Sequence, residues 1–154
     1  MKNRSRLLLG VLILLGGILL FLWQDRNLVI IDADTGEVYG SWPMKEKDIF
    51  SLEFIHSVNQ TPVVDEFMVI KSGFRAHRTI YSSFGAGVQT QLNEGERLSY
   101  DEDGNMIISG FSQTYVKLNL IVGTVSDHIL TVGKTEISLR ELCGRNTSVI
   151  LRVR

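Results

Sequence analysis

The sequence has a single cysteine among its 154 residues, so it cannot form an internal disulfide. Cys143 is far from the N-terminal apolar segment, which also excludes the acylated cysteine of a lipoprotein. We interpret Cys143 as a small buried apolar residue, because free cysteine is among the most buried residue types. Without the apolar segment roughly 130 residues remain, which is about one domain and enough to bury a core unaided by disulfides.

An excess of either charge is also missing. The chain carries 16 Lys and Arg against 17 Asp and Glu, for a formal net charge of −1. Proteins that bind nucleic acid usually gather a basic excess on one face, so we expect no nucleic-acid partner. The sequence contains no internal repeat, no low-complexity tract and no second domain boundary.

What the sequence does contain, at its start, is an uncharged apolar run from Leu7 to Trp23. This length is at the short end of what crosses a bilayer, and Trp23 stands where an interfacial aromatic anchor belongs. Lys2, Arg4 and Arg6 precede the run, so the positive-inside tendency places the N-terminus in the cytoplasm. A cleaved signal peptide is the alternative, but residues 21–26 offer no small residue for the cut.

We therefore expect a single-pass protein of the cell membrane with a retained signal anchor. Residues 1–26 would form a cytoplasmic tip and one transmembrane helix, and residues 27–154 an extracytoplasmic β domain.

The outer part shows short alternating runs of β-branched and aromatic residues separated by Gly, Asp and Asn, which is the pattern of an all-β domain. Turns at Asp103-Gly104 and Gly133-Lys134 predict hairpins. We predict an antiparallel sandwich or a partly closed barrel, and the sequence does not choose between them. The predicted strands are 28–31, 37–42, 49–56, 66–70, 75–82, 97–100, 106–110, 114–122, 128–132, 135–139 and 148–153, with one helical turn at 139–143.

Polar residues gather around the stretch 54–67. If the strands ending at His56 and starting at Glu66 pair with their apolar sides together, Phe54 lies opposite Met68 and His56 opposite Glu66. A histidine and a carboxylate would then meet at the end of an apolar face. Such a pair can close the core and fix the following loop, bind a polar ligand or partner, or transfer protons.

The strand 75–82 would return to the same end of the sheet and deliver a glycine-containing segment beside that loop. We predict a rim that binds a ligand or a partner. Its candidate residues are His56, Ser57, Thr61, Pro62, Glu66, Ser83, Gly85 and Gly87.

Signs of catalysis or of a metal site are weak. Ser57 follows His56 directly, and neighbouring strand residues point to opposite faces, so they do not form a nucleophile and base. His56, His77 and His128 lack ligand spacing. The glycines at 85 and 87 precede no helical pattern or basic residue, so we interpret them as backbone packing rather than a phosphate loop. We expect no catalytic residue, no metal and no cofactor.

The sequence resembles a bacterial family of domains of unknown function, the DUF1850 type. The matching features are the N-terminal anchor, a later Asp103-Gly104 and the closing segment 137–153, together with three local motifs. The motifs are Ile55-His56-Ser57-Val58, then Thr61-Pro62-Val63 with Glu66, and Ser83-Phe84-Gly85-Ala86-Gly87. Gln89 stands where the family pattern has a proline, and this departure concerns the loop after the glycines.

The resemblance implies a setting rather than an activity. Members of this family accompany the membrane subunit of TAXI-type TRAP transporters, which import solutes with an extracytoplasmic receptor. We therefore expect a non-enzymatic accessory protein that contacts the permease or the solute receptor. The alternative is a stand-alone extracytoplasmic domain that binds a small ligand or senses envelope stress, and a hydrolase is a third reading.

Overall fold

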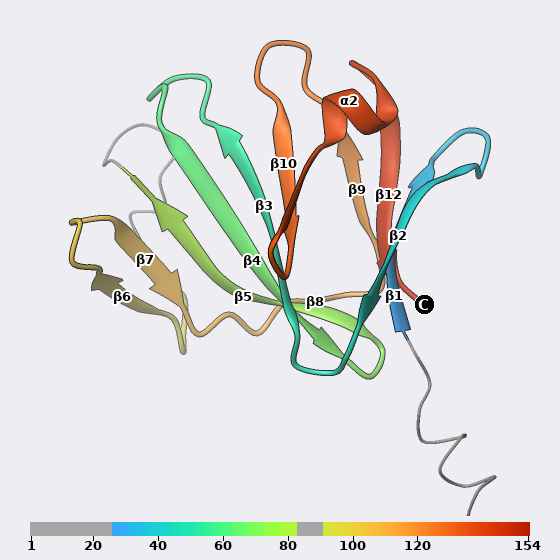
Figure 1. The fold of residues 1–154 in the computed structure, drawn as a ribbon. Helices are drawn as coiled ribbons and strands as arrows, with labels where there is room; N and C mark the ends of the chain where they lie inside the picture. The colour runs from blue at the N-terminus through green and yellow to red at the C-terminus, as the bar shows by residue number, and fades with distance from the viewer. Residues whose placement is uncertain (1–25, 83–90) are drawn as a thin grey trace, which may run out of the picture.

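The computed structural model describes residues 26–82 and 91–154, which form two antiparallel sheets (Figure 1). The smaller sheet has four strands. Its order is β2 (Val38–Met44), β1 (Arg26–Asp32), β12 (Ser148–Val153) and β9 (Leu118–Ile121). The predicted hairpin of the two first strands is confirmed, because β1 and β2 pair through a tight turn at 33–37.

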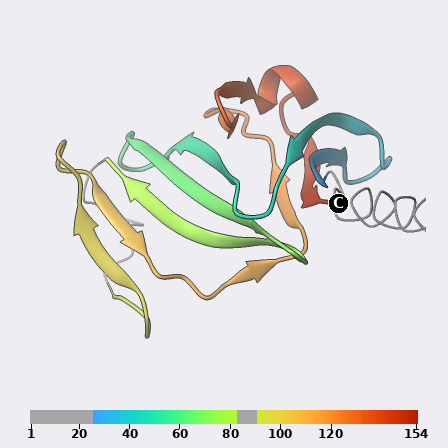
Figure 2. The ribbon, with the colours of Figure 1, turned by 60° about the horizontal axis from the view of Figure 1, so that its bottom comes forward.

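The larger sheet contains the rim segments that the sequence singled out. Its path is β11 (Thr135–Ser138), β10 (His128–Val132), β3 (Ile49–Ile55), β4 (Pro62–Ile70), β5 (Gly73–Tyr81), β7 (Met106–Ser109) and β6 (Arg97–Tyr100). The short strand β8 (Thr114–Tyr115) pairs with the beginning of β5. Figure 2 shows β7 and β6 extending away from the smaller sheet.

The two sheets share one hydrophobic core, to which β1 and β12 contribute from one side and β3, β4, β5 and β10 from the other. Its centre is aromatic. The Phe50 ring stacks on Phe67 at 5.3 Å between centroids and meets Phe74 edge-on at 5.1 Å. Tyr115 stacks on Phe74 at 5.7 Å, so β8 is fixed to the core as well as to the edge of β5.

The helical turn is also confirmed. α2 (Leu139–Cys143) begins at Ser138, whose side chain accepts a hydrogen bond from the Glu141 amide. This is an ordinary N-cap, and the buried Leu139 side chain fixes the turn to the core.

The all-β, antiparallel prediction is confirmed, and neither sheet closes into a barrel within the described residues. Most predicted strands agree with the structure to within two residues, and two predictions were wrong by more than that. The predicted strand 114–122 is broken at Val116-Lys117, where the chain passes from the larger to the smaller sheet as β8 and β9. The strand predicted to begin at Glu66 begins at Pro62.

The expected transmembrane segment Leu7–Trp23 lies outside the described residues. Within residues 26–82 and 91–154, no helix has the length and apolar character needed to cross a membrane.

Candidate functional site

The predicted meeting of His56 with Glu66 does not occur. In the observed register Ile55 lies opposite Pro62, and Glu66 lies opposite Ser51. Glu66 is four residues further along β4 than Pro62, roughly 13 Å at the usual rise of a strand. The pairing was wrong because the prediction put Met68 and Ile70 on the buried face, whereas the buried residues of β4 are Val63, Phe67 and Val69.

Glu66 has a different partner. Its carboxylate accepts two hydrogen bonds from Arg78, of 2.7 and 2.8 Å, across the pair of β4 and β5. The hydrogen bonds to Glu66 raise the pKa of Arg78 above its usual value. This two-pronged ion pair fixes the register of the strands beside a bulge that follows Glu66.

His56 fixes the turn after β3. Its Nδ1 accepts from the amides of Val58 and Asn59 at 3.3 and 3.4 Å, and its own amide donates to the Thr61 carbonyl at 2.9 Å. His56, Ser57, Thr61 and Pro62 therefore do lie together. This arrangement matches the interpretation in which the histidine pins the loop before Pro62.

The end of β5 returns to that loop as predicted, since Tyr81 lies opposite Val63 and the Ser82 amide donates to the Pro62 carbonyl at 3.3 Å. The remaining predicted rim residues, Ser83, Gly85 and Gly87, lie outside the described residues. Ser57 lines a hollow of about 350 Å³ between this loop and the connection 123–126.

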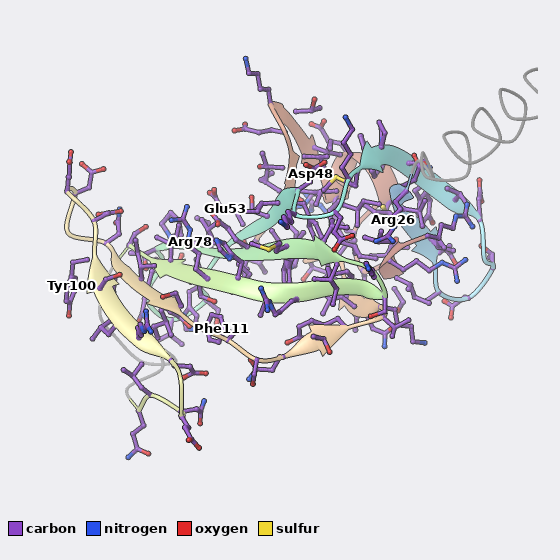
Figure 3. The ribbon with its side chains drawn as sticks, turned by 90° about the horizontal axis from the view of Figure 1, so that it is seen from below. Arg26, Asp48, Glu53, Arg78, Tyr100 and Phe111 are labelled. Carbon is purple, nitrogen blue, oxygen red and sulfur yellow. The ribbon has the colours of Figure 1, made fainter. Side chains whose placement is uncertain are left out.

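A second concavity, which the sequence analysis did not identify, lies between the sheets. It has a volume of about 380 Å³, which falls within the range of small-molecule sites. One wall is the inner face of β3, β4 and β5, and the other is β9. The connection from β7 to β8, which carries Phe111 (labelled in Figure 3), closes one side. We call this concavity the inter-sheet cavity.

Asp65 is the central polar residue of the inter-sheet cavity. Directly paired residues share a face, and the register aligns Leu130, Leu52, Asp65 and Thr79 across four strands. Asp65 thus sits in a row of core positions. The Thr79 hydroxyl donates a hydrogen bond to Oδ1 of Asp65 at 2.7 Å. Burial raises the pKa of Asp65, and the Thr79 hydrogen bond opposes this only partly.

Among the described residues, no cation pairs with the Asp65 carboxyl. No Lys or Arg of residues 26–82 and 91–154 lines the inter-sheet cavity, whereas Glu66 and Glu96 do, and Glu66 is paired with Arg78. Residues 83–90 contain no Lys or Arg in their sequence. Aromatic side chains make up much of the remaining wall, namely Phe54, Phe67, Phe111 and Tyr115. The cavity therefore brings a partly buried carboxyl together with aromatic surfaces.

His128 lies where the two concavities meet, because it lines both of them together with Phe54. Its ring packs on Phe54 with centroids 5.8 Å apart. Burial lowers the pKa of His128, and its Nδ1 accepts from the Gly123 amide at 3.3 Å. The neutral imidazole therefore carries its proton on Nε2.

The described part of the chain contains neither a metal site nor a reactive thiol. No group of three or more His, Cys, Asp or Glu in residues 26–82 and 91–154 is placed to hold a metal ion. Cys143 is half-buried rather than fully buried, and burial raises the pKa of its thiol to about 11. A thiol with that pKa is protonated at neutral pH and is a poor nucleophile.

The sequence holds one signal for Asp65. In the alternating run Val63, Asp65, Phe67, Val69, the carboxylate occupies a position where period-two patterning predicts a core residue. A charged residue on the apolar face of a strand is a marker of function, because it is costly to bury.

The fold and the inter-sheet cavity define an all-β domain of two antiparallel sheets with a ligand-sized concavity between them. The sequence profile of a family described as "Domain of unknown function (DUF1850)" matches residues 50–139, from the second residue of β3 to the first of α2. The chain belongs to this family. No curated protein and no solved structure matches the chain.

Proposed function

We propose that the β domain is a non-enzymatic binding module for a small organic molecule that carries a protonated nitrogen, bound in the inter-sheet cavity. The observation that carries this proposal is the Asp65 carboxyl, which faces a cavity of about 380 Å³ without a cationic partner in the described part of the chain. A charge that is partly removed from water is usually paired, and here the pairing group would arrive with the ligand.

The walls of the cavity suit such a ligand. A protonated amine would donate a charge-assisted hydrogen bond to Asp65, which is stronger than a neutral one. The faces of Phe54, Phe67 and Tyr115 would attract the same cation through their ring quadrupoles and would cover its apolar part. A bound cation would favour the ionised form of Asp65 and so oppose the burial that raises its pKa in the empty cavity.

The location that we propose is the outer face of a membrane. The apolar run Leu7–Trp23, preceded by three cations, supports a single transmembrane helix with the N-terminus in the cytoplasm. The β domain would then bind its ligand outside the cell membrane, close to the bilayer.

A panel of matched ligands tests the binding proposal. Full-length protein in detergent is heated with small primary, tertiary and quaternary amines and with the uncharged alcohol or alkane of the same shape. We expect amines to stabilise the protein and their neutral counterparts not to. A ligand at a hundred times its Kd adds about 2.7 kcal/mol, which shifts a domain of this size by several degrees. Equal shifts for amines and neutral counterparts, or none for either, would refute the proposal.

A second candidate function is that of an accessory subunit of a TAXI-type TRAP transporter, contacting the permease or the solute receptor. Its support is the family resemblance together with the apolar run Leu7–Trp23. The loop 56–62, placed at the end of the sheet, would be the contact surface.

Affinity purification distinguishes this role. The tagged full-length chain, extracted in mild detergent from its native cells, is expected to retain the permease or receptor. Val58→Asp, which charges a 66% exposed apolar residue of the loop, is expected to release them, whereas Lys134→Asp in a distant turn is not. Purification of the chain free of every transporter subunit, or unchanged solute uptake after its deletion, contradicts the role.

A further inference from the structure

Basic residues surround the point at which the described chain begins. The Arg26 guanidinium donates to the Ile70 carbonyl at 2.8 Å, next to Lys71 at the turn from β4 to β5. The Lys47 amide, in the turn from β2 to β3, donates to the Val69 carbonyl at 2.9 Å. Arg154 pairs through its backbone with Asn27. Figure 3 shows this end of the molecule from below, with Arg26 labelled.

The passage from β8 to β9 belongs to the same surface. A Cβ placed on Gly73 would lie 2.1 Å from the Tyr115 carbonyl oxygen and 3.1 Å from the Cα of Val116. Val116 and Lys117 therefore lie against the turn that carries Lys71. The Val116 side chain is 75% exposed.

We call this surface the basic end. Its cations are Arg26, Lys45, Lys47, Lys71, Lys117 and Arg154, and its apolar residue is Val116. Glu46 and Asp48 share the turn with Lys45 and Lys47, and Asp25 precedes Arg26 in the sequence, so positive charge is in excess. By contrast, the connections 33–37 and 101–105, at the far ends of β1 and β6, contain only acidic charges.

Covalent geometry limits how far the basic end can lie from the apolar run. Trp23 is three residues before Arg26, and an extended chain spans at most about 3.6 Å per residue, or roughly 11 Å in all. Charges interact over about 8 Å at physiological ionic strength. If the run crosses a bilayer, Arg26 lies close to this range of the lipid headgroups, and the other cations of the basic end belong to segments beside it.

We propose that the basic end lies on the membrane surface and binds anionic phospholipid headgroups, with Val116 entering the interface between headgroups and acyl chains. The inference rests on the membrane anchor of the proposed function. Lysines and arginines near a bilayer are attracted by anionic lipids, and an exposed apolar side chain beside them adds burial of apolar area. The loop 56–62 would then point away from the membrane, because β3 runs from the basic end towards it.

Spin labelling of the full chain tests the proposal. In a Cys143→Ser background, a nitroxide is placed at Val116→Cys or, as the control, at Val125→Cys, where the side chain is 93% exposed on the connection from β9 to β10. Each protein is reconstituted in nanodiscs of phosphatidylcholine alone or with phosphatidylglycerol. Collisions with a water-soluble nickel complex and with oxygen are measured by continuous-wave electron paramagnetic resonance.

In anionic nanodiscs we expect the label at 116 to collide with the nickel complex at least about threefold less often than the label at 125, and more often with oxygen. Lys71→Glu should weaken this protection, whereas Arg145→Glu, on the connection before β12, should not. Equal nickel accessibility at 116 and 125 in a chain that has inserted overturns the proposal. Equal protection with and without anionic lipid overturns its charge-dependent part. A chain that does not enter nanodiscs at all refutes the anchor instead.

Discussion

Asp65→Asn should lower the affinity for an amine ligand on the order of a hundredfold while making the empty protein more stable at neutral pH. The first effect follows from loss of the carboxylate charge that would pair with the bound cation. Removing one partner of a desolvated, hydrogen-bonded charge pair costs about 2–5 kcal/mol, and each 1.4 kcal/mol is a factor of ten in Kd. Titration calorimetry with the best amine of the panel measures it.

The effect on stability has the opposite sign because the empty cavity penalises the charge. Burial raises the pKa of Asp65 in the folded protein, so the folded state holds its proton to a higher pH than the unfolded state does. The contribution of this group to stability is therefore full below its unfolded pKa of about 3.9, and is lost as the pH rises through the folded value. Asparagine stays uncharged throughout and can still accept a hydrogen bond from Thr79.

Urea unfolding at a series of pH values from about 4 upward measures this difference. The advantage of Asp65→Asn over the parent protein should grow with pH, whereas Asp103→Asn, at an exposed position in the turn from β6 to β7, should leave both stability and affinity nearly unchanged. An Asp65→Asn variant that binds amines as tightly as the parent would show that Asp65 is not the counter-ion. A stability difference that shrinks with rising pH would contradict the role of burial.

Gly73→Ala should unfold the protein far more easily than Gly36→Ala, although both glycines have a positive φ. At Gly36, with φ +78°, an added Cβ meets nothing within 4 Å, so the cost is only the left-handed backbone, about 1–2 kcal/mol. At Gly73, with φ +135°, the Cβ would also lie 2.1 Å from the Tyr115 carbonyl oxygen. Strain and overpacking each add about 1–3 kcal/mol, for a total of roughly 2–6 kcal/mol.

Thermal unfolding of the two variants compares their losses of stability directly. The difference between the two losses isolates the contact between β5 and β8. Because Tyr115 also lines the inter-sheet cavity, Gly73→Ala should reduce amine affinity in any fraction that stays folded, and Gly36→Ala should not. Similar melting temperatures for the two variants would mean that β8 moves aside without cost, and that the stacking of Tyr115 on Phe74 does not hold it.

Most of the strands could be predicted because their signals are local. The alternation in Ile49 to Ile55, the Asp103-Gly104 turn and the helical turn 139–143 each depend on neighbouring residues, and all three appear as predicted. The break at Val116-Lys117 gave no such signal. It arises where the chain leaves one sheet for the other, which depends on where β5 and β12 lie in space.

The rim was predicted only in part, for a related reason. The return of β5 beside the loop 56–62 follows from connectivity, and it is confirmed as far as Ser82. The predicted cross-strand pair of His56 and Glu66 depended on the register between β3 and β4. A shift of one residue turns every side chain of a strand to the other face, and two apolar faces were available on β4, one with Met68 and Ile70 and one with Phe67 and Val69.

The sequence by itself determined that residues beyond the apolar run form antiparallel strands and where most of them begin and end, because period and turn chemistry are properties of neighbouring residues. Only the tertiary structure decided that Asp65 lines a cavity without a described cationic partner, whereas Glu66, which lines the same cavity, is paired with Arg78. That outcome needs β3, β4, β5 and β9 to be in place together, and burial, which sets the chemistry of a carboxyl, exists only once distant strands have packed around it.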